Sequence, residues 1–157
     1  MFIGERLKAE VLIENLYTIG LFHDCGVPLM ALKFPTYGNE VYSNRTNSTL
    51  SLKEIEDAEL GTNHAVMGYY ISNNWLLPKN ICYLILNHHE TDFLMGHYDP
   101  VDLKSFAVLK MAENIVNEIR SLEPINQWLD IQQIVFETLA FDSDDYNDIK
   151  DELSDIM

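Results

Sequence analysis

The sequence contains few cysteines, few basic residues and no long apolar run. Its two cysteines, Cys25 and Cys82, lie far apart and have no CxxC partner, which is typical of buried thiols in a reducing compartment rather than of a disulfide framework. No apolar stretch is long enough to span a bilayer, and the chain opens with charged residues instead of a signal-peptide core. We therefore expect a cytoplasmic protein.

The charge of the chain is strongly one-sided. Ten Lys and Arg residues stand against 25 Asp and Glu residues, which gives a formal net charge of −15. Such a surface repels phosphate backbones and anionic lipids, so we expect neither a nucleic acid nor a membrane as partner. Much of the excess lies in residues 142–157, DSDDYNDIKDELSDIM, for which we predict a solvated acidic helix.

Motifs of nucleophilic catalysis and of phosphate binding are also missing. The chain has no GxSxG elbow and no Gly-rich phosphate loop. Cys25 is close to His23 in the sequence, but no spacing specifies a histidine partner for either thiol.

Period-two alternation is almost absent, while apolar residues recur at helical spacing, so we predict an all-α fold. The first helix, with Leu7 to Ile19 on its apolar face, should be interrupted by Gly26 and Pro28. At 157 residues and 47% hydrophobic composition, with no linker or repeat, residues 1–157 form one domain in the simplest interpretation.

Helix start signals place the remaining segments. Ser51 with Glu54 matches a capping box, Thr62 can cap the helix that follows Gly61, and Asp102 can cap the long helix that contains LKMAENIV. Pro78 can begin a helix whose sequence, ICYLILNHH, is apolar all round and predicts a buried central helix. TDFLMGHYDP, residues 91–100, has the Gly and Pro content of a loop.

Histidines and an aspartate gather at predicted helix ends, in two adjacent pairs and one single position: His23 with Asp24, His64, and His88 with His89. Neutral imidazoles and a carboxylate are common ligands of Zn, Mn or Fe, and helix bundles build metal sites from such groups. Adjacent histidines on a helix point about a quarter-turn apart, so one ion would rarely bind both, whereas two neighbouring metals, or a metal and a substrate, could.

A purely structural interpretation competes with the metal site. A histidine at a helix C-terminus often complements the helix dipole, which explains His23, His88 and His89 one at a time. It explains Asp24 poorly, because a carboxylate at a helix C-terminus is unfavourable without a cation. His97 lies in the predicted loop, and we assign it no role.

The order of these residues resembles a known family. GLFHDCG resembles the HD signature of metal-dependent phosphohydrolases, and the chain is similar to the HDOD group, the HD-related output domains of bacterial signalling proteins. The similarity is most specific in EIEDAELGTNHAVMGYYISNNWLLPKNICYLILNHHE. There the family's residue order is matched by Glu56, Gly61, His64, Gly68, Trp75, Leu77 with Pro78, and His88 with His89.

The resemblance implies an HD-domain-like helical bundle and a set of metal ligands. Carried over by position, these are His23, Asp24, His64, His88, His89 and, in the segment MAENIV where the family usually has an Ala-Asp pair, Glu113. The implied cofactor is a divalent metal, with Fe, Mn, Zn and Mg as the candidates.

Departures from the HD enzymes bear on the function. Val27 stands where a lysine often follows the HD pair, and no GYP follows the double histidine. Typical HDOD domains have more helices upstream, so we expect a shortened domain or a fragment. The leading expectation is a regulatory output domain with a vestigial or weakly active metal site, which binds a signalling protein or a second copy of itself. The alternative is a metal-dependent phosphohydrolase acting on a nucleotide or cyclic nucleotide.

Overall fold

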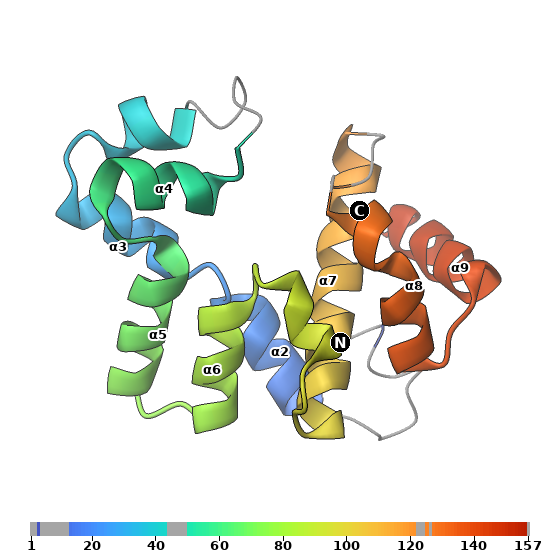
Figure 1. The fold of residues 1–157 in the computed structure, drawn as a ribbon. Coiled ribbons are helices and arrows are strands. Elements are labelled where there is room, and N and C mark those ends of the chain that lie inside the picture. The colour runs from blue at the N-terminus through green and yellow to red at the C-terminus, as the bar shows by residue number, and fades with distance from the viewer. Residues whose placement is uncertain (1–2, 4–12, 44–49, 122–124, 126, 157) are drawn as a thin grey trace. The chain divides into compact units, whose positions relative to one another are not determined.

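The computed structural model describes residue 3 and residues 13–43, 50–121, 125 and 127–156. Every regular element within these residues is a helix, and none is a strand (Figure 1). The predicted all-α fold is therefore confirmed. Residues 7–12 of the predicted first helix lie outside the described part of the chain.

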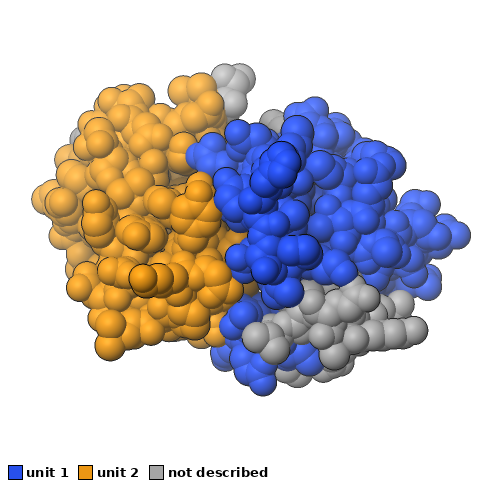
Figure 2. Space-filling model, turned by 60° about the horizontal axis from the view of Figure 1, so that its bottom comes forward, with its two compact units in different colours: residues 1–17, 90–157 blue, residues 18–89 orange. Residues whose placement is uncertain are grey.

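The chain divides into two compact units, coloured separately in Figure 2. Unit 1 comprises residues 1–17 and 90–157, and unit 2 comprises residues 18–89. Helix α2 (Ile13–Phe22) crosses the boundary between them. That the whole chain is one folding domain stays a prediction. No helix in the described ranges has the length and apolarity needed to cross a membrane.

Unit 2 is built around helix α5, which packs against α3 and α6. Its elements after α2 are α3 (Gly26–Lys33), the π-helix η1 (Tyr37–Tyr42), α4 (Leu52–Leu60), α5 (His64–Asn74) and α6 (Lys79–Asn87). Met30, Tyr37, Val41 and Ile55 form a buried cluster where α3, η1 and α4 meet. The packing of α5 against α3 and α6 holds the start of α3, the start of α5 and the end of α6 close together within this unit.

The break after the first helix differs from the prediction. α2 ends at Phe22, a three-residue turn follows, and Gly26 begins α3 instead of ending a helix. A Cβ atom on Gly26 would overlap the carbonyl group of His64 and lie 2.8 Å from the amide nitrogen of Gly68. Gly26 is therefore required by the close approach of α3 to α5, and Pro28 fits in the first turn of α3, where its missing N–H costs no helical bond.

The capping predictions are partly confirmed. Ser51 and Glu54 form the predicted capping box of α4. α5 is capped by Asn63, whose side chain accepts a hydrogen bond from the Val66 amide, so the assignment to Thr62 was wrong by one residue. Pro78 precedes α6 as predicted, but Tyr83 is 42% exposed, so this helix is buried on one face rather than all round.

Unit 1 contains the long helix α7 and two helices that pack against it. Its elements are the 3-10 helix η3 (Thr91–Met95), α7 (Pro100–Ser121), α8 (Trp128–Leu139) and α9 (Ser143–Ser154). The segment predicted as a loop thus contains η3. Asp99, not Asp102, accepts the hydrogen bond of the Val101 amide at the start of α7. The predicted acidic C-terminal helix is confirmed as α9, with Asp142 as its cap.

Candidate metal centre

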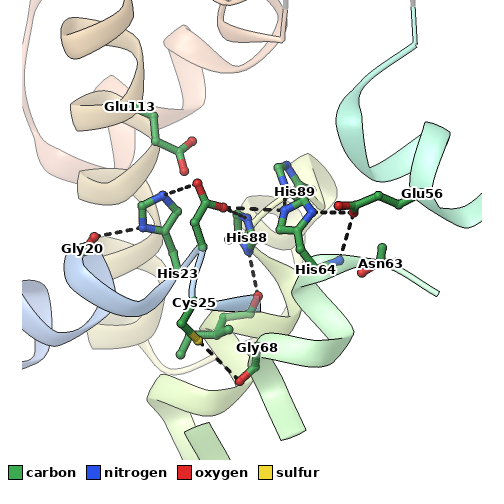
Figure 3. Close-up of polar contacts among 12 residues, drawn as sticks. Gly20, His23, Cys25, Glu56, Asn63, His64, Gly68, His88, His89 and Glu113 are labelled. Carbon is green, nitrogen blue, oxygen red and sulfur yellow. Dashed lines mark hydrogen bonds and ion pairs between the residues drawn. The ribbon is translucent and has the colours of Figure 1, made fainter. Parts of the chain in front are cut away.

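The predicted ligands of unit 2 come from three helix ends. His23 and Asp24 lie in the turn between α2 and α3, His64 is the first residue of α5, and His88 and His89 follow the last residue of α6. Packing of α5 against α3 and α6 brings these ends to one place, and Figure 3 shows the side chains directed at one another.

Four of these side chains form a tight group. Asp24 Oδ1 lies 3.6 Å from His64 Nε2 and 3.4 Å from His88 Nε2. With His89 included, each residue offers one ligand atom, and these atoms all lie within 4.8 Å of one another. His64 and His88 are buried, whereas the Asp24 side chain is 56% exposed. The group could hold a metal ion, and it is reachable from solvent through Asp24.

The other ring nitrogens are used to orient the imidazoles. His64 Nδ1 lies 2.5 Å from Glu56 Oε2, and His88 Nδ1 lies 2.7 Å from the carbonyl oxygen of Ile85. A carbonyl oxygen and a carboxylate accept hydrogen bonds and do not donate them, so each Nδ1 carries the proton. In a neutral ring the lone pair then lies on Nε2, the atom that faces Asp24. Metal-binding histidines are held in this way in many proteins.

The Nε2 atoms of His64 and His88 lie close to one carboxylate oxygen of Asp24, and His64 Nε2 also lies 2.7 Å from His89 Nε2. A cation placed among these atoms would be attracted by the carboxylate and by the ring nitrogens that carry a lone pair. Ligands of a tetrahedral zinc ion lie about 3.3 Å apart, from Zn–N distances of about 2.05 Å. The separations of 3.4 and 3.6 Å match this spacing, while the 2.7 Å between His64 Nε2 and His89 Nε2 would have to widen. The donor set could therefore hold a divalent ion once the side chains adjust their spacing.

His23 has a different place from the other histidines. Its Nε2 lies 3.4 Å from Asp24 Oδ2, the carboxylate oxygen on the other side from His88, and its Nδ1 lies 3.0 Å from the Gly20 carbonyl oxygen. His23 is thus a neighbour of the four-residue group through Asp24.

The charge state of Asp24 follows from its histidine neighbours. Burial alone would raise the pKa of this carboxyl, but the neighbouring His23 and His88 lower it by more. The net effect holds the pKa of Asp24 well below its usual range, so the carboxylate is ionised and available to a cation.

His88 and His89 each offer a ligand atom to the group, and the expectation that one ion would rarely bind both stays a prediction. α6 ends at Asn87, so the two residues lie in a turn and not on a regular helix. Their ring centroids are only 3.9 Å apart. The quarter-turn argument applies inside a helix and not to residues that follow its end.

Two residues considered in the sequence lie in unit 1 and not in unit 2. Glu113 lies on α7 in unit 1, where Lys110 Nζ donates to its carboxylate at 2.6 Å, and its place among the ligands stays a prediction. His97 also lies in unit 1 and is exposed.

Cys25 is not arranged as a nucleophile. Its thiol lies 3.8 Å from the carbonyl oxygen of Gly68, the group to which it donates. Burial and the nearby negative charge of Asp24 raise the pKa of the thiol, which keeps it protonated.

Sequence reasoning missed the residues behind His64. Glu56 was noted only as a matching position, and Tyr37, whose hydroxyl donates to Glu56 Oε1 at 2.5 Å, was not considered. Glu56 is fully buried in a helix with mostly charged neighbours in sequence. Only the tertiary structure separates it from the exposed acids of α4.

Comparison with known proteins identifies the family. Residues 2–91 match the HDOD domain. The chain belongs to the HDOD family. The matched region contains Asp24, His64, His88 and His89, and it ends before Glu113. No curated protein and no solved structure matches the chain.

Proposed function

We propose that this HDOD domain is a regulatory output module that binds a divalent metal at Asp24, His64, His88 and His89 and acts through protein contacts. The observation that carries the proposal is the convergence of four ligand atoms within 4.8 Å, with the Nδ1 atoms of His64 and His88 held by acceptors. The family supports a role as a signalling output domain. The partner we propose is a signalling protein or a second copy of the chain.

The donor set favours some metals over others. Three imidazole nitrogens and one carboxylate oxygen suit Zn²⁺, Fe²⁺ or Mn²⁺, whereas Mg²⁺ prefers oxygen ligands and retains several waters. When bound, such an ion would supply a fixed positive charge that can polarise a phosphoryl oxygen. The protein's own part is to keep Asp24 ionised and to direct the imidazole nitrogens at one point.

Catalytic power is disfavoured by the surroundings of α3. Val27, at the position where HD enzymes often have lysine, packs against the apolar cluster of Met30 and Tyr37. Such a site gives no cationic side chain to stabilise charge that develops on a phosphoryl group. The lysines described in unit 2 have other places: Lys33 lies over the Phe34 ring, Lys53 pairs with Asp57, and Lys79 begins α6 at the end opposite His88.

Replacing Asp24 by Asn tests the proposal. The substitution keeps the shape of the side chain and removes the charge that balances a divalent ion, so we expect the affinity for Zn²⁺ and Mn²⁺ to fall at least tenfold. Titration calorimetry on chelator-treated, untagged protein measures this. Asp148→Asn, an exposed position on α9, is the matched control and should bind like the wild type.

The same proteins separate the module from the enzyme. We expect little or no hydrolysis of bis(p-nitrophenyl) phosphate by the metal-loaded wild type. Robust hydrolysis that Asp24→Asn abolishes would make a phosphohydrolase the better assignment, and a wild type that binds neither Zn²⁺ nor Mn²⁺ would remove the metal from the proposal.

A further inference from the structure

A fully buried carboxylate lies directly behind His64. Glu56, on α4, has no exposed surface. Its hydrogen-bond donors are the His64 ring, the His64 amide and the Tyr37 hydroxyl, and none of them is a lysine or an arginine. Burying a carboxylate is costly unless hydrogen bonds satisfy it. A carboxylate retained at such a position therefore calls for a physical explanation.

Both contacts of Glu56 Oε2 are to one residue. This oxygen lies 2.9 Å from the His64 amide nitrogen and 2.5 Å from His64 Nδ1. The two bonds fix the backbone and the ring of His64 at once, so the imidazole cannot turn without losing a contact. Because a carboxylate accepts and does not donate, the ring is held with its proton on Nδ1 and its lone pair on Nε2.

Tyr37 performs the corresponding task for Glu56. Its hydroxyl donates to Oε1, so each carboxylate oxygen has its own partner and the group cannot rotate freely. The Tyr37 ring is 1% exposed and is fixed in the cluster with Met30, Val41 and Ile55. It comes from the π-helix η1, a form of helix that is frequent at functional sites.

His88 provides a comparison within the same group. Its Nδ1 is held by a backbone carbonyl of its own helix, a local contact that needs no additional side chain. His64 is the first residue of α5 and has no preceding helical turn to supply such a carbonyl. Glu56 takes the place of that carbonyl and adds a negative charge, which makes the imidazole a stronger donor toward a cation.

We propose that Glu56 and Tyr37 are positioning residues of the centre: Glu56 fixes His64 as the Nδ1–H tautomer, so that its Nε2 lone pair is available to a cation, and Tyr37 orients Glu56. The expected changes in metal affinity rest on the proposed function, because they require that the centre binds a metal. The tautomer, in contrast, can be measured without any metal.

Nuclear magnetic resonance of the histidine rings tests the first part. Long-range ¹H–¹⁵N correlation spectra of chelator-treated protein, at alkaline pH where imidazoles are neutral, distinguish the two tautomers. We expect His64 with a protonated Nδ1 and a bare Nε2, assigned by comparison with a His64→Gln protein. The opposite tautomer in the wild type would overturn the inference.

Metal affinity tests the second part, with four variants and Zn²⁺ and Mn²⁺ as probes. Glu56→Gln can still accept from His64 through its amide oxygen but has lost the charge, so we expect binding to be 10- to 100-fold weaker. Tyr37→Phe keeps the packed ring and should weaken binding by a smaller factor. The double variant should bind no more weakly than Glu56→Gln alone, because Tyr37 acts through Glu56.

Glu54→Gln is the control on the same helix. Glu54 belongs to the capping box of α4, where its carboxylate accepts from the Ser51 amide, so its loss should affect stability and leave the affinity unchanged. Equal affinities of Glu56→Gln and the wild type would overturn the proposal. If the wild type binds neither ion, the proposed function fails, and the tautomer of His64 in the same sample still decides this inference.

Discussion

Gly26 brings the backbone of α3 against the first turn of α5, and the cluster of ligands depends on this contact. Any side chain at position 26 would overlap the carbonyl group of His64, one of the proposed ligands. Backbone atoms cannot move aside as the end of a long side chain can. A methyl group here would therefore destabilise unit 2 and shift the backbone of His64.

We expect Gly26→Ala to destabilise the protein by about 1–3 kcal/mol or more, since overpacking forces the backbone to shift. Gly20→Ala is the matched control: a Cβ there meets nothing within 4 Å, and alanine in the last turn of α2 should stabilise by up to about 1 kcal/mol. Urea unfolding of both variants measures the difference. If Gly26→Ala were as stable as the wild type, the close approach of α3 and α5 would be wrong.

Single residues also show what the sequence could predict of the site. The grouping of Asp24, His64, His88 and His89 was predicted from residue type, position and family resemblance, because candidate ligands are recognisable by their side-chain chemistry. Glu56 and Tyr37 were not, since a buried acid and a buried tyrosine look like any surface acid and core aromatic in sequence. Their roles come from a contact between residues 19 positions apart.

At the scale of helices, the sequence predicted the longer helices and erred at helix ends and at η3, whose residues were predicted as a loop. Apolar spacing is a property of many residues together and survives local error, so α6 and α7 are confirmed as helices. A cap, in contrast, depends on a single residue. Thr62 and Asp102 were predicted as caps, but Asn63 and Asp99, which lie close by and also carry hydrogen-bond acceptors, are the residues that cap α5 and α7. The burial of α6 was overestimated because Tyr83 counted as apolar in sequence but is partly exposed.

The attachment of α9 to α7 rests on a group of polar side chains around Glu118. Its carboxylate accepts from Asn114 and Tyr146 through Oε1 and from Lys150 through Oε2, at 2.8 to 2.9 Å. Burial by itself would raise the pKa of Glu118, but these hydrogen bonds and the charge of Lys150 outweigh it and lower the pKa below its ordinary value of 4.5. Burial and the bond to Glu118 raise the pKa of Tyr146, which stays protonated.

The contribution of Glu118 to the free energy of unfolding should depend on pH. A carboxyl whose pKa is lower in the folded state stabilises the protein above its unfolded pKa, and this contribution is lost as the pH falls through the folded pKa. We expect Glu118→Gln to cost about 1–2 kcal/mol at pH 7, and the difference from the wild type to shrink once the pH is well below 4.5. Urea titrations at several pH values test this, with the exposed Asp151→Asn as control; a difference that does not change with pH would contradict it.

At the scale of the whole molecule, chemistry and charge are distributed unequally between the units. All four residues of the ligand group belong to unit 2, while the acidic helix α9 belongs to unit 1. A ligand that binds only the native state stabilises what it binds, by about 2.7 kcal/mol at a hundred times its dissociation constant. Metal binding should therefore stabilise most the helices of unit 2 whose ends carry the proposed ligands.

Hydrogen exchange measured by mass spectrometry tests this distribution. We expect Zn²⁺, compared with chelator, to slow exchange in the turn after α2, in the first turn of α5 and at the end of α6, because opening any of these would release a ligand. Amides of α8 and α9 that exchange by local opening should be unaffected, since such opening leaves the four ligands in place. The Asp24→Asn protein should show no slowing with the same Zn²⁺ concentration. Slowing that extends along α7 around Glu113, and that Glu113→Gln removes, would establish Glu113 as a further ligand. Slowing confined to α8 and α9 would show that the ion binds the acidic surface of unit 1 instead of the histidine cluster.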